Sequence, residues 1–353
     1  MRRALALAAR AAGETNPNPM VGCVVVKAGR VVGDGYHRKA GGLHAEAIAL
    51  EHAGAGARGA TLYVNLEPCA HQGRTPPCAP RLAAAGVKRV VAAMRDPNPA
   101  VNGRGFALLR RAGIDLATGV LEDEARSLNE RFAVAARERR PFVLLKAALT
   151  LDGRVATAAG ESKWITSPLQ RREARRLRRL HDAVLVGIGT VLTDDPLLLP
   201  SPRVRRPFTR VVLDSRLRLP PGSRLVRSAR RSPVVVIAQR APAANRRRLE
   251  SRGVFVIEAA GRGGRVGLPW ALRALWRRGV GSVMVEGGSE VLGSFLAERL
   301  FDQVALFRAP LLMGGRDSLP AFGGPGPKGL SGAVRLRPGP SANASYELWY
   351  PER

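Results

Sequence analysis

The stretch His44-Ala-Glu46, followed by Pro-Cys69 and then by Cys78, decides the fold of the first half of this chain. One histidine and two cysteines are the ligand set of a catalytic zinc site that keeps a fourth position open for water. Zinc held by three protein ligands lowers the pKa of such a water to about 7. Glu46 is left to carry protons, so the pattern predicts a hydrolytic deaminase that replaces an exocyclic amine with oxygen.

The local sequence supports this interpretation. Residues 43–52 predict a helix that opens at the motif, and residues 61–66 predict a strand. Prolines at 76, 77 and 80 favour a helix start near Cys78, where the helix dipole stabilises a thiolate. Each residue taken alone would be an ordinary structural residue, but the combination is specific. Cys23 lies in an apolar run, and we expect it in the core rather than on the metal.

Eight residues separate the two cysteines, where deaminases usually have C-x-x-C. With this insertion the sequence resembles the bifunctional deaminase/reductase family of riboflavin biosynthesis. The resemblance rests on residues 16–23, 35–37, 44–46, 66–78 and 96–99, which read NPNPMVGC, GYH, HAE, LEPCAHQGRTPPC and DPNP. Ala70 departs from the family, which usually has serine there.

Several residues of the first half are candidates for substrate binding. In the insertion, His71, Arg74 and Thr75 with backbone N–H groups form a predicted grip for a terminal phosphate, a solvated loop tip being the alternative. Asn18 stands in a loop bracketed by prolines and is predicted to bond the base or ribose, although an ordinary turn asparagine also fits. The resemblance implies that His37 contacts the substrate, and the alternative is that His37 is an ordinary residue at the edge of a hairpin.

The chain has 353 residues, which is too long for one deaminase core, so we expect two domains. Strands predicted at 20–26, 61–66, 89–93 and 114–118 alternate with helices and indicate an α/β sandwich. A charged helix over 122–139 leads to Arg140-Pro141, where we place the boundary between domains 1–140 and 141–353. The resemblance implies a cytidine-deaminase-like three-layer α/β/α domain followed by a dihydrofolate-reductase-like α/β domain.

The second half contains apolar, β-branched runs typical of strands buried on both faces of a doubly wound sheet. They lie at 142–149, 183–186, 209–213, 233–238, 254–257 and 282–286. The last run leads into Gly287-Gly288 and then into a predicted helix that begins at Glu290. A strand followed by glycines and a helix is the geometry that binds a phosphate group at the helix N-terminus. A plain strand-to-helix turn is the alternative, and G-x-G-x-x-G is absent.

The resemblance extends over this half through residues 150–155, 160–167, 189–196 and 285–288. It implies NADPH as cofactor, with contacts from Ala148, Trp164, Thr190, Asp194, Ser215, Gly288, Ser289 and Ser294. It implies contacts with the reductase substrate from Ser162, Arg178, Leu198 and Glu286. After Asp195-Pro196 the family usually runs Leu-Thr-Val-Arg, whereas this chain reads Leu198-Leu-Pro-Ser-Pro-Arg203. Arg203 is therefore one candidate for the substrate phosphate, and another arginine is the alternative.

The composition and charge of the chain limit the classes of partner that it is expected to bind. The formal net charge is +29, and lysines are only 6 of the 57 basic residues. A positive surface attracts phosphorylated substrates, a phosphorylated dinucleotide and nucleic acid alike. Aromatics make up 5% of the chain and are not interleaved with the arginine runs, so we do not expect nucleic acid as a partner. Three cysteines and no apolar run of about 18 residues favour a cytoplasmic enzyme without a membrane span, which we expect to be a homo-oligomer.

The hypothesis is a bifunctional enzyme with Zn²⁺ and NADPH as cofactors. By resemblance, it first deaminates 2,5-diamino-6-ribosylamino-4(3H)-pyrimidinone 5′-phosphate and then reduces the ribosyl group to a ribityl chain. One alternative is a tRNA-type nucleic-acid deaminase with a basic C-terminal module. The other is a deaminase whose C-terminal half is an inactive assembly domain.

Overall fold

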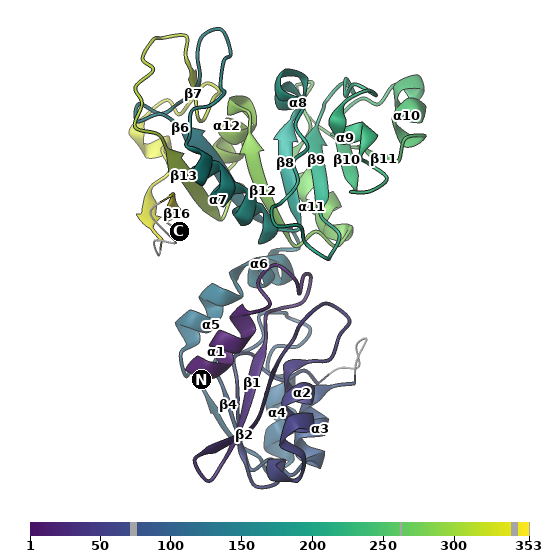
Figure 1. Ribbon diagram of the computed structural model, residues 1–353, viewed down its shortest axis with the longest axis vertical. Helices are drawn as coiled ribbons and strands as arrows, with labels where there is room; N and C mark the ends of the chain where they lie inside the picture. The colour runs from purple at the N-terminus through teal and green to yellow at the C-terminus, as the bar shows by residue number, and fades with distance from the viewer. Residues whose placement is uncertain (71–75, 262, 340–344, 353) are drawn as a thin grey trace. The chain divides into compact units, whose positions relative to one another are not determined.

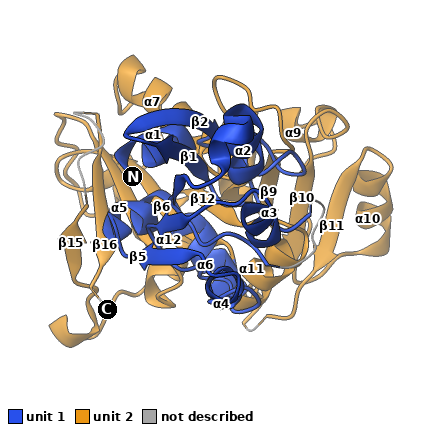
Figure 2. Cartoon of the chain, turned by 90° about the horizontal axis from the view of Figure 1, so that it is seen from below, with its two compact units in different colours: residues 1–140 blue, residues 141–353 orange. Residues whose placement is uncertain are grey.

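The structure is a computed structural model in which residues 1–70, 76–261, 263–339 and 345–352 are described. The chain forms two units, Met1–Arg140 and Pro141–Arg353, which Figure 2 shows in separate colours. Each unit has a sheet and hydrophobic clusters of its own. Within the described ranges, none of the helices is long and apolar enough to cross a membrane.

The first unit is built on a five-stranded sheet with the order β2-β1-β3-β4-β5. Its strands are β1 (Gly22–Lys27), β2 (Arg30–Tyr36), β3 (Thr61–Val64), β4 (Arg89–Ala92) and β5 (Asp115–Thr118). β1 pairs antiparallel with β2 and β3, whereas β3, β4 and β5 run parallel. The parallel strands therefore end at one edge of the sheet, where the loops that follow them meet.

Helices cover both faces of this sheet (Figure 1). On one side lie α1 (Arg2–Ala9) and α5 (Glu122–Leu128), and on the other lie α2 (Ala45–Ala53), α3 (Cys78–Ala84) and α4 (Arg104–Arg111). Side chains alternate along β1, so that Cys23 and Val25 pack with α2 and α3 while Val24 packs with α1. The predicted three-layer α/β/α arrangement is confirmed, and Cys23 is a fully buried core residue.

Two details of the first unit differ from the prediction. Strand β2 was not predicted, because its glycines break the apolar alternation. These glycines let α2 pack closely on the strand, because a Cβ on Gly33 would lie 2.3 Å from the Ala49 carbonyl oxygen. The single helix predicted over 122–139 is wrong, since α5 ends before Asn129 and α6 (Glu130–Glu138) follows. The Asn129 side chain bonds both the N–H and the carbonyl of Met20, at 2.8 and 3.0 Å, and thereby interrupts the helix.

The second unit has a nine-stranded sheet with the order β11-β10-β9-β8-β12-β6-β13-β16-β15 and a small sheet of β14 and β7. The strands are β6 (Phe142–Leu149), β7 (Arg154–Ala156), β8 (Ala183–Gly187), β9 (Thr209–Leu213), β10 (Val234–Ala238), β11 (Val254–Glu258), β12 (Ser282–Gly287), β13 (Gln303–Arg308), β14 (Leu319–Pro320), β15 (Leu336–Pro338) and β16 (Glu347–Pro351). All six predicted runs are strands. The short C-terminal strands were not predicted, and β16 pairs antiparallel with both β13 and β15.

The helices of this unit are α7 (Pro168–Arg179), α8 (Ile188–Asp194), α9 (Arg224–Arg227), α10 (Ala243–Glu250), α11 (Leu268–Arg277) and α12 (Ser289–Ala297), and the chain also has short 3-10 turns at Gly54–Ala57 and Leu330–Gly332. The sheet is buried on both faces. Val235 and Ile237 of β10 join the cluster that contains α11 and α12, whereas Val234 and Val236 join the cluster with α9 and α10. The central strands β8, β12 and β6 are parallel, so their carboxyl ends share one edge.

Candidate active sites

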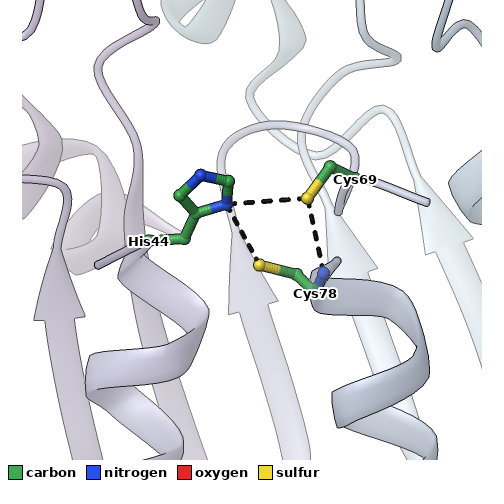
Figure 3. Close-up of side chains that lie close together, drawn as sticks. All are labelled: His44, Cys69 and Cys78. Atoms are coloured by element: carbon green, nitrogen blue, oxygen red, sulfur yellow. Dashed lines mark hydrogen bonds between the residues drawn. The ribbon is translucent and has the colours of Figure 1, made fainter. Parts of the chain in front are cut away.

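Three ligand-type side chains meet at the edge where α2 and α3 begin (Figure 3). His44 precedes α2 as its N-cap residue, Cys78 is the first residue of α3, and Cys69 lies in the segment after β3. The His44 Nδ1 atom is 3.3 Å from the Cys78 sulfur and 3.5 Å from the Cys69 sulfur. All three ligand atoms lie within 4.8 Å of one another.

This spacing fits zinc. In a tetrahedral site with a Zn–N bond of about 2.0 Å and a Zn–S bond of about 2.3 Å, the nitrogen and sulfur are about 3.5 Å apart. The distances from His44 Nδ1 to the two sulfurs match that value. Two thiols and an imidazole are also the donors that zinc prefers. The residues therefore fit the metal in number, type and separation.

The protonation of the two thiols is unequal. Their mutual hydrogen bond lowers the pKa of Cys69 and raises the pKa of Cys78, and burial adds to the rise at Cys78. The Cys69 sulfur also accepts a hydrogen bond from the Cys78 backbone N–H at 3.3 Å. The pair thus carries one thiolate, and binding of a divalent metal displaces the remaining thiol proton.

Glu46 stands in the first turn of α2, directly beside these ligands. Its side chain is buried, with 4% exposed, and burial raises the pKa of its carboxyl group. Together with His44 and Cys69 it lines a cavity of about 380 Å³. A buried carboxyl group with a raised pKa that faces a cavity is suited to moving protons.

Asn18 and His37 line the same cavity. His37 Nδ1 lies 3.0 Å from the Leu43 carbonyl oxygen, so this nitrogen carries the proton and donates. The other ring nitrogen then accepts from the Asn18 Nδ2 group at 3.0 Å. Burial lowers the pKa of His37, which agrees with a neutral ring. The arrangement aims the Asn18 amide and holds His37 as its support.

The predicted phosphate grip, His71, Arg74 and Thr75, lies outside the described residues. Sequence reasoning missed Glu67 and Asp96, which also line the cavity. Burial, together with the nearby charge of Glu67, raises the pKa of Asp96 to about 6, although a hydrogen bond from the Asn98 N–H opposes the rise. Glu67 and Asp96 belong to the motifs LEPC and DPNP, on which the family resemblance rests, but neither residue was assigned a role from the sequence.

A second cavity, of about 1320 Å³, opens at the carboxyl ends of β6, β8 and β12. It brings together ten of the predicted residues: Ala148, Ser162, Trp164, Arg178, Thr190, Asp194, Leu198, Glu286, Gly288 and Ser289. Gly287 has φ +134°, a conformation that favours glycine, and leads into the first turn of α12. The N–H groups of that turn and the size of the cavity fit a dinucleotide whose pyrophosphate lies at the helix start.

The polar centre of this cavity is formed by Arg178, Glu286 and Lys146. Arg178 holds both carboxylate oxygens of Glu286, with one nitrogen–oxygen distance of 2.8 Å. Lys146 has its Nζ atom 5.3 Å from the centre of the Phe307 ring, and burial lowers the pKa of its amine despite the opposing charge of Glu286. We did not assign Lys146 from the sequence, although a lysine within the apolar run 142–149 was a visible signal.

Three predicted residues do not line the large cavity. The Ser215 carbonyl accepts hydrogen bonds from the N–H groups of Gln239 and Arg240. The Ser294 hydroxyl donates to the Glu290 carbonyl within α12. Arg203 is exposed, in the loop before β9.

Comparisons with known proteins cover both units. Residues 1–94 match the cytidine and deoxycytidylate deaminase zinc-binding region, and residues 141–342 match the RibD C-terminal domain. The riboflavin biosynthesis protein RibD of Aquifex aeolicus is 46% identical over 316 residues, which are 89% of this chain and 87% of that protein. The chain belongs to the RibD family of riboflavin biosynthesis proteins. The Escherichia coli RibD protein is 43% identical over 89% of this chain and 88% of its own length.

Solved structures of the RibD family agree with this membership. Acinetobacter baumannii RibD, form 2, has a TM-score of 0.88 and 37% identity over 99% of this chain and 97% of that chain. The diaminohydroxyphosphoribosylaminopyrimidine deaminase/5-amino-6-(5-phosphoribosylamino)uracil reductase from Thermotoga maritima has a TM-score of 0.86 and 37% identity over 100% and 97%. As a family member, the chain is a zinc-dependent deaminase joined to an NADPH-dependent reductase, and the two-part α/β fold predicted from the sequence is confirmed.

Proposed function

We propose that residues 1–140 deaminate 2,5-diamino-6-ribosylamino-4(3H)-pyrimidinone 5′-phosphate and that residues 141–353 then reduce its ribosyl group to a ribityl chain. The observation that carries this proposal is the placement of His44, Cys69 and Cys78 at zinc-ligand distances beside buried Glu46, on a cavity of about 380 Å³. The Thermotoga maritima relative, whose printed name contains both activities, supports the choice of substrate.

In the deaminase unit, His44, Cys69 and Cys78 hold the zinc ion. Zinc, when bound, supplies a Lewis acid that makes water reactive near neutral pH. Glu46 takes one proton from the attacking water and passes it to the ring nitrogen; it then takes the second proton from the hydroxyl group formed on the carbon and passes it to the leaving amine, so that ammonia departs and a carbonyl remains. The raised pKa of Glu46 suits both the uptake and the release of that proton. Asn18, aimed by its bond to His37, orients the base or ribose.

In the reductase unit, NADPH supplies the hydride when bound. Gly288, Ser289 and the first N–H groups of α12 bind its pyrophosphate. Arg178 and Glu286 form a fixed pair that orients the polar groups of the substrate. The buried amine of Lys146 stands close to this pair and delivers the proton that accompanies the hydride.

The two units are proposed to fold independently, because each has its own sheet and hydrophobic clusters. A fragment of residues 141–353 is expected to bind NADPH without containing zinc. NADPH is expected to bind more tightly than NADH, since the extra phosphate meets an arginine-rich surface. Titration with both nucleotides checks this. A folded fragment that binds neither would contradict it, and equal affinity would remove the preference for NADPH.

We also propose a cellular location and an oligomeric state for the enzyme. Cys23, Cys69 and Cys78 are free thiols, which supports a reducing, cytoplasmic location. A homo-oligomeric state, expected from the sequence, is part of the same proposal. Light scattering of the purified chain measures the oligomeric state, and a monomer at micromolar concentration would contradict this part.

The test of function is turnover of the diaminopyrimidine phosphate with and without NADPH, followed by mass spectrometry. Without NADPH, the product is expected to have an amine replaced by oxygen and to accumulate together with ammonia. With NADPH, the same product is expected to gain a pair of hydrogens while the cofactor is oxidised. If NADPH is consumed without prior deamination, the proposed order of the two steps is wrong.

A further inference from the structure

The large cavity of the second unit is rich in cations, and three of the six already have partners among polar or aromatic side chains and carbonyl groups. Its lining contains Lys146, Lys163, Arg171, Arg175, Arg178 and Arg224. Arg178 is paired with Glu286, and Lys163 lies 3.2 Å from Asp194. Arg171 stacks on the Trp164 ring at 4.4 Å and donates to the Thr166 carbonyl. A phosphate dianion that enters this cavity therefore needs a cation that these contacts have not used.

Arg175 is such a cation. Within the described part of the chain, its side chain makes no hydrogen bond or ion pair. It lies one helical turn before Arg178 on α7, and the spacing of Arg171, Arg175 and Arg178 places all three on one face of the helix, toward the cavity. Arg175 is exposed at the mouth, so its guanidinium reaches a ligand without losing an internal contact.

The loop opposite Arg175 is fixed to the same helix. The Arg178 guanidinium donates to the Leu199 carbonyl at 3.0 Å, and the Ser201 N–H donates to the Arg175 carbonyl at 3.2 Å. These bonds place Ser201, a neutral residue, on the cavity wall next to Arg175. Arg203, two residues further along the loop, is not part of that wall. The loop therefore brings no positive charge to this end of the cavity.

Two lining cations remain: Lys146, which delivers the proton in the proposed function, and Arg224, which is held beside the end of α8. The Arg224 backbone N–H donates to Asp195 at 2.8 Å, directly after α8. Helix α8 carries Thr190, whose hydroxyl oxygen would lie 3.6 Å from a Cβ on Gly288. Arg224 is thus held at the end of α8, the helix whose first turn faces the glycine turn where the dinucleotide binds in the proposed function. Arg175 lies with Arg178 and Glu286, where the ribosyl group is reduced.

We infer that Arg175 binds the 5′-phosphate of the reductase substrate and sets the preference of this unit for a phosphorylated ribosyl compound. The inference rests on the proposed function of the second unit. The phosphate lies at the far end of the ribosyl group from the carbon that is reduced, so its partner stands about one helical turn from Arg178. A guanidinium suits this task because it offers parallel N–H donors to phosphate oxygens.

The experiment compares R175Q and R175K with wild type, using the deaminated substrate with and without its phosphate. R175Q is expected to raise KM for the phosphorylated compound roughly 10- to 100-fold, the value of a hydrogen bond to a charged group, with little change in kcat. R175K is expected to recover part of that loss. The dephosphorylated compound is expected to react equally well with wild type and R175Q, and inorganic phosphate is expected to inhibit wild type more strongly than R175Q.

Arg176 offers a matched control, since it lies on the same helix, is exposed, pairs with Glu173 at 3.1 Å and does not line the cavity. R176Q is expected to retain the wild-type KM. A KM within twofold of wild type for R175Q, equal losses for both compounds, or a larger effect in R203Q would overturn the inference. Failure of wild type to oxidise NADPH with the phosphorylated compound would instead overturn the proposed function on which the inference rests.

Discussion

Replacement of Glu67 by glutamine tests how the chain positions its metal ligand Cys69. The Glu67 side chain is 3% exposed, and its carboxylate accepts hydrogen bonds from four backbone N–H groups. One oxygen bonds Asp96 and Gly103 at 3.1 and 2.9 Å, and the other bonds Gly105 and Phe106 at 2.9 and 3.2 Å. This carboxylate therefore ties the segment that carries Cys69 to the start of α4.

The magnitude follows from the number of acceptors lost. A glutamine amide keeps one oxygen, which accepts two of the four N–H groups, and turns its NH₂ group toward the other two donors. Each hydrogen bond to a charged group contributes about 1.5–3 kcal/mol, so the loss of two is expected to cost about 3–6 kcal/mol. The whole free energy of unfolding of a domain is about 5–15 kcal/mol, so E67Q is expected to weaken the first unit severely.

The chain provides separate probes for its two units. All four tryptophans lie within residues 141–353, so their fluorescence reports on the second unit, while a zinc-binding dye reports on release from the first. In a denaturant titration, E67Q is expected to release zinc at a lower concentration while the tryptophan transition stays in place. The exposed Glu51 of α2 provides the control, and E51Q is expected to match wild type. Zinc release from E67Q at the wild-type midpoint would refute this account of Glu67.

Three further predictions concern the same unit. E46Q is expected to keep its zinc but lose deamination by roughly 10²-fold or more, with reduction of the deaminated substrate unchanged; near-normal ammonia release would show that Glu46 is not the proton carrier. Metal analysis of C69A and C78A is expected to give well below one zinc per chain, whereas C23A keeps its zinc; full zinc in both ligand variants would exclude the site. Because the pKa of Asp96 rises from 3.8 to about 6 on folding, the folded state binds its proton more tightly, and stability falls as pH rises through that range. At pH 7 the free energy of unfolding of D96N is expected to exceed that of wild type by up to about 3 kcal/mol, and below pH 4 the two values are expected to be equal. Equal stability of the two proteins at both pH values would contradict the raised pKa of Asp96.

The metal site was predictable because its chemistry depends on residue type and local structure. The chain has only five histidines and three cysteines, and the helix start favoured by prolines positions Cys78 without reference to distant residues. The apolar runs of the second half likewise identified the strands of its sheet, since continuous β-branched segments indicate burial on both faces. The family resemblance added the cofactors and thirteen candidate residues for the second half, and the structure brings ten of those residues together around the large cavity.

Only the tertiary structure decided which polar groups share a site. Glu67 and the N–H groups it binds are 29 to 39 residues apart, and Arg178 and Glu286 are 108 apart. The break at Asn129 depends on Met20, and the role inferred for Arg175 depends on which neighbouring cations already have partners. Local sequence sets helix starts and strand faces because those depend on adjacent residues. Hydrogen-bond partners and unneutralised charge depend on the whole packed chain, and therefore appear only when it folds.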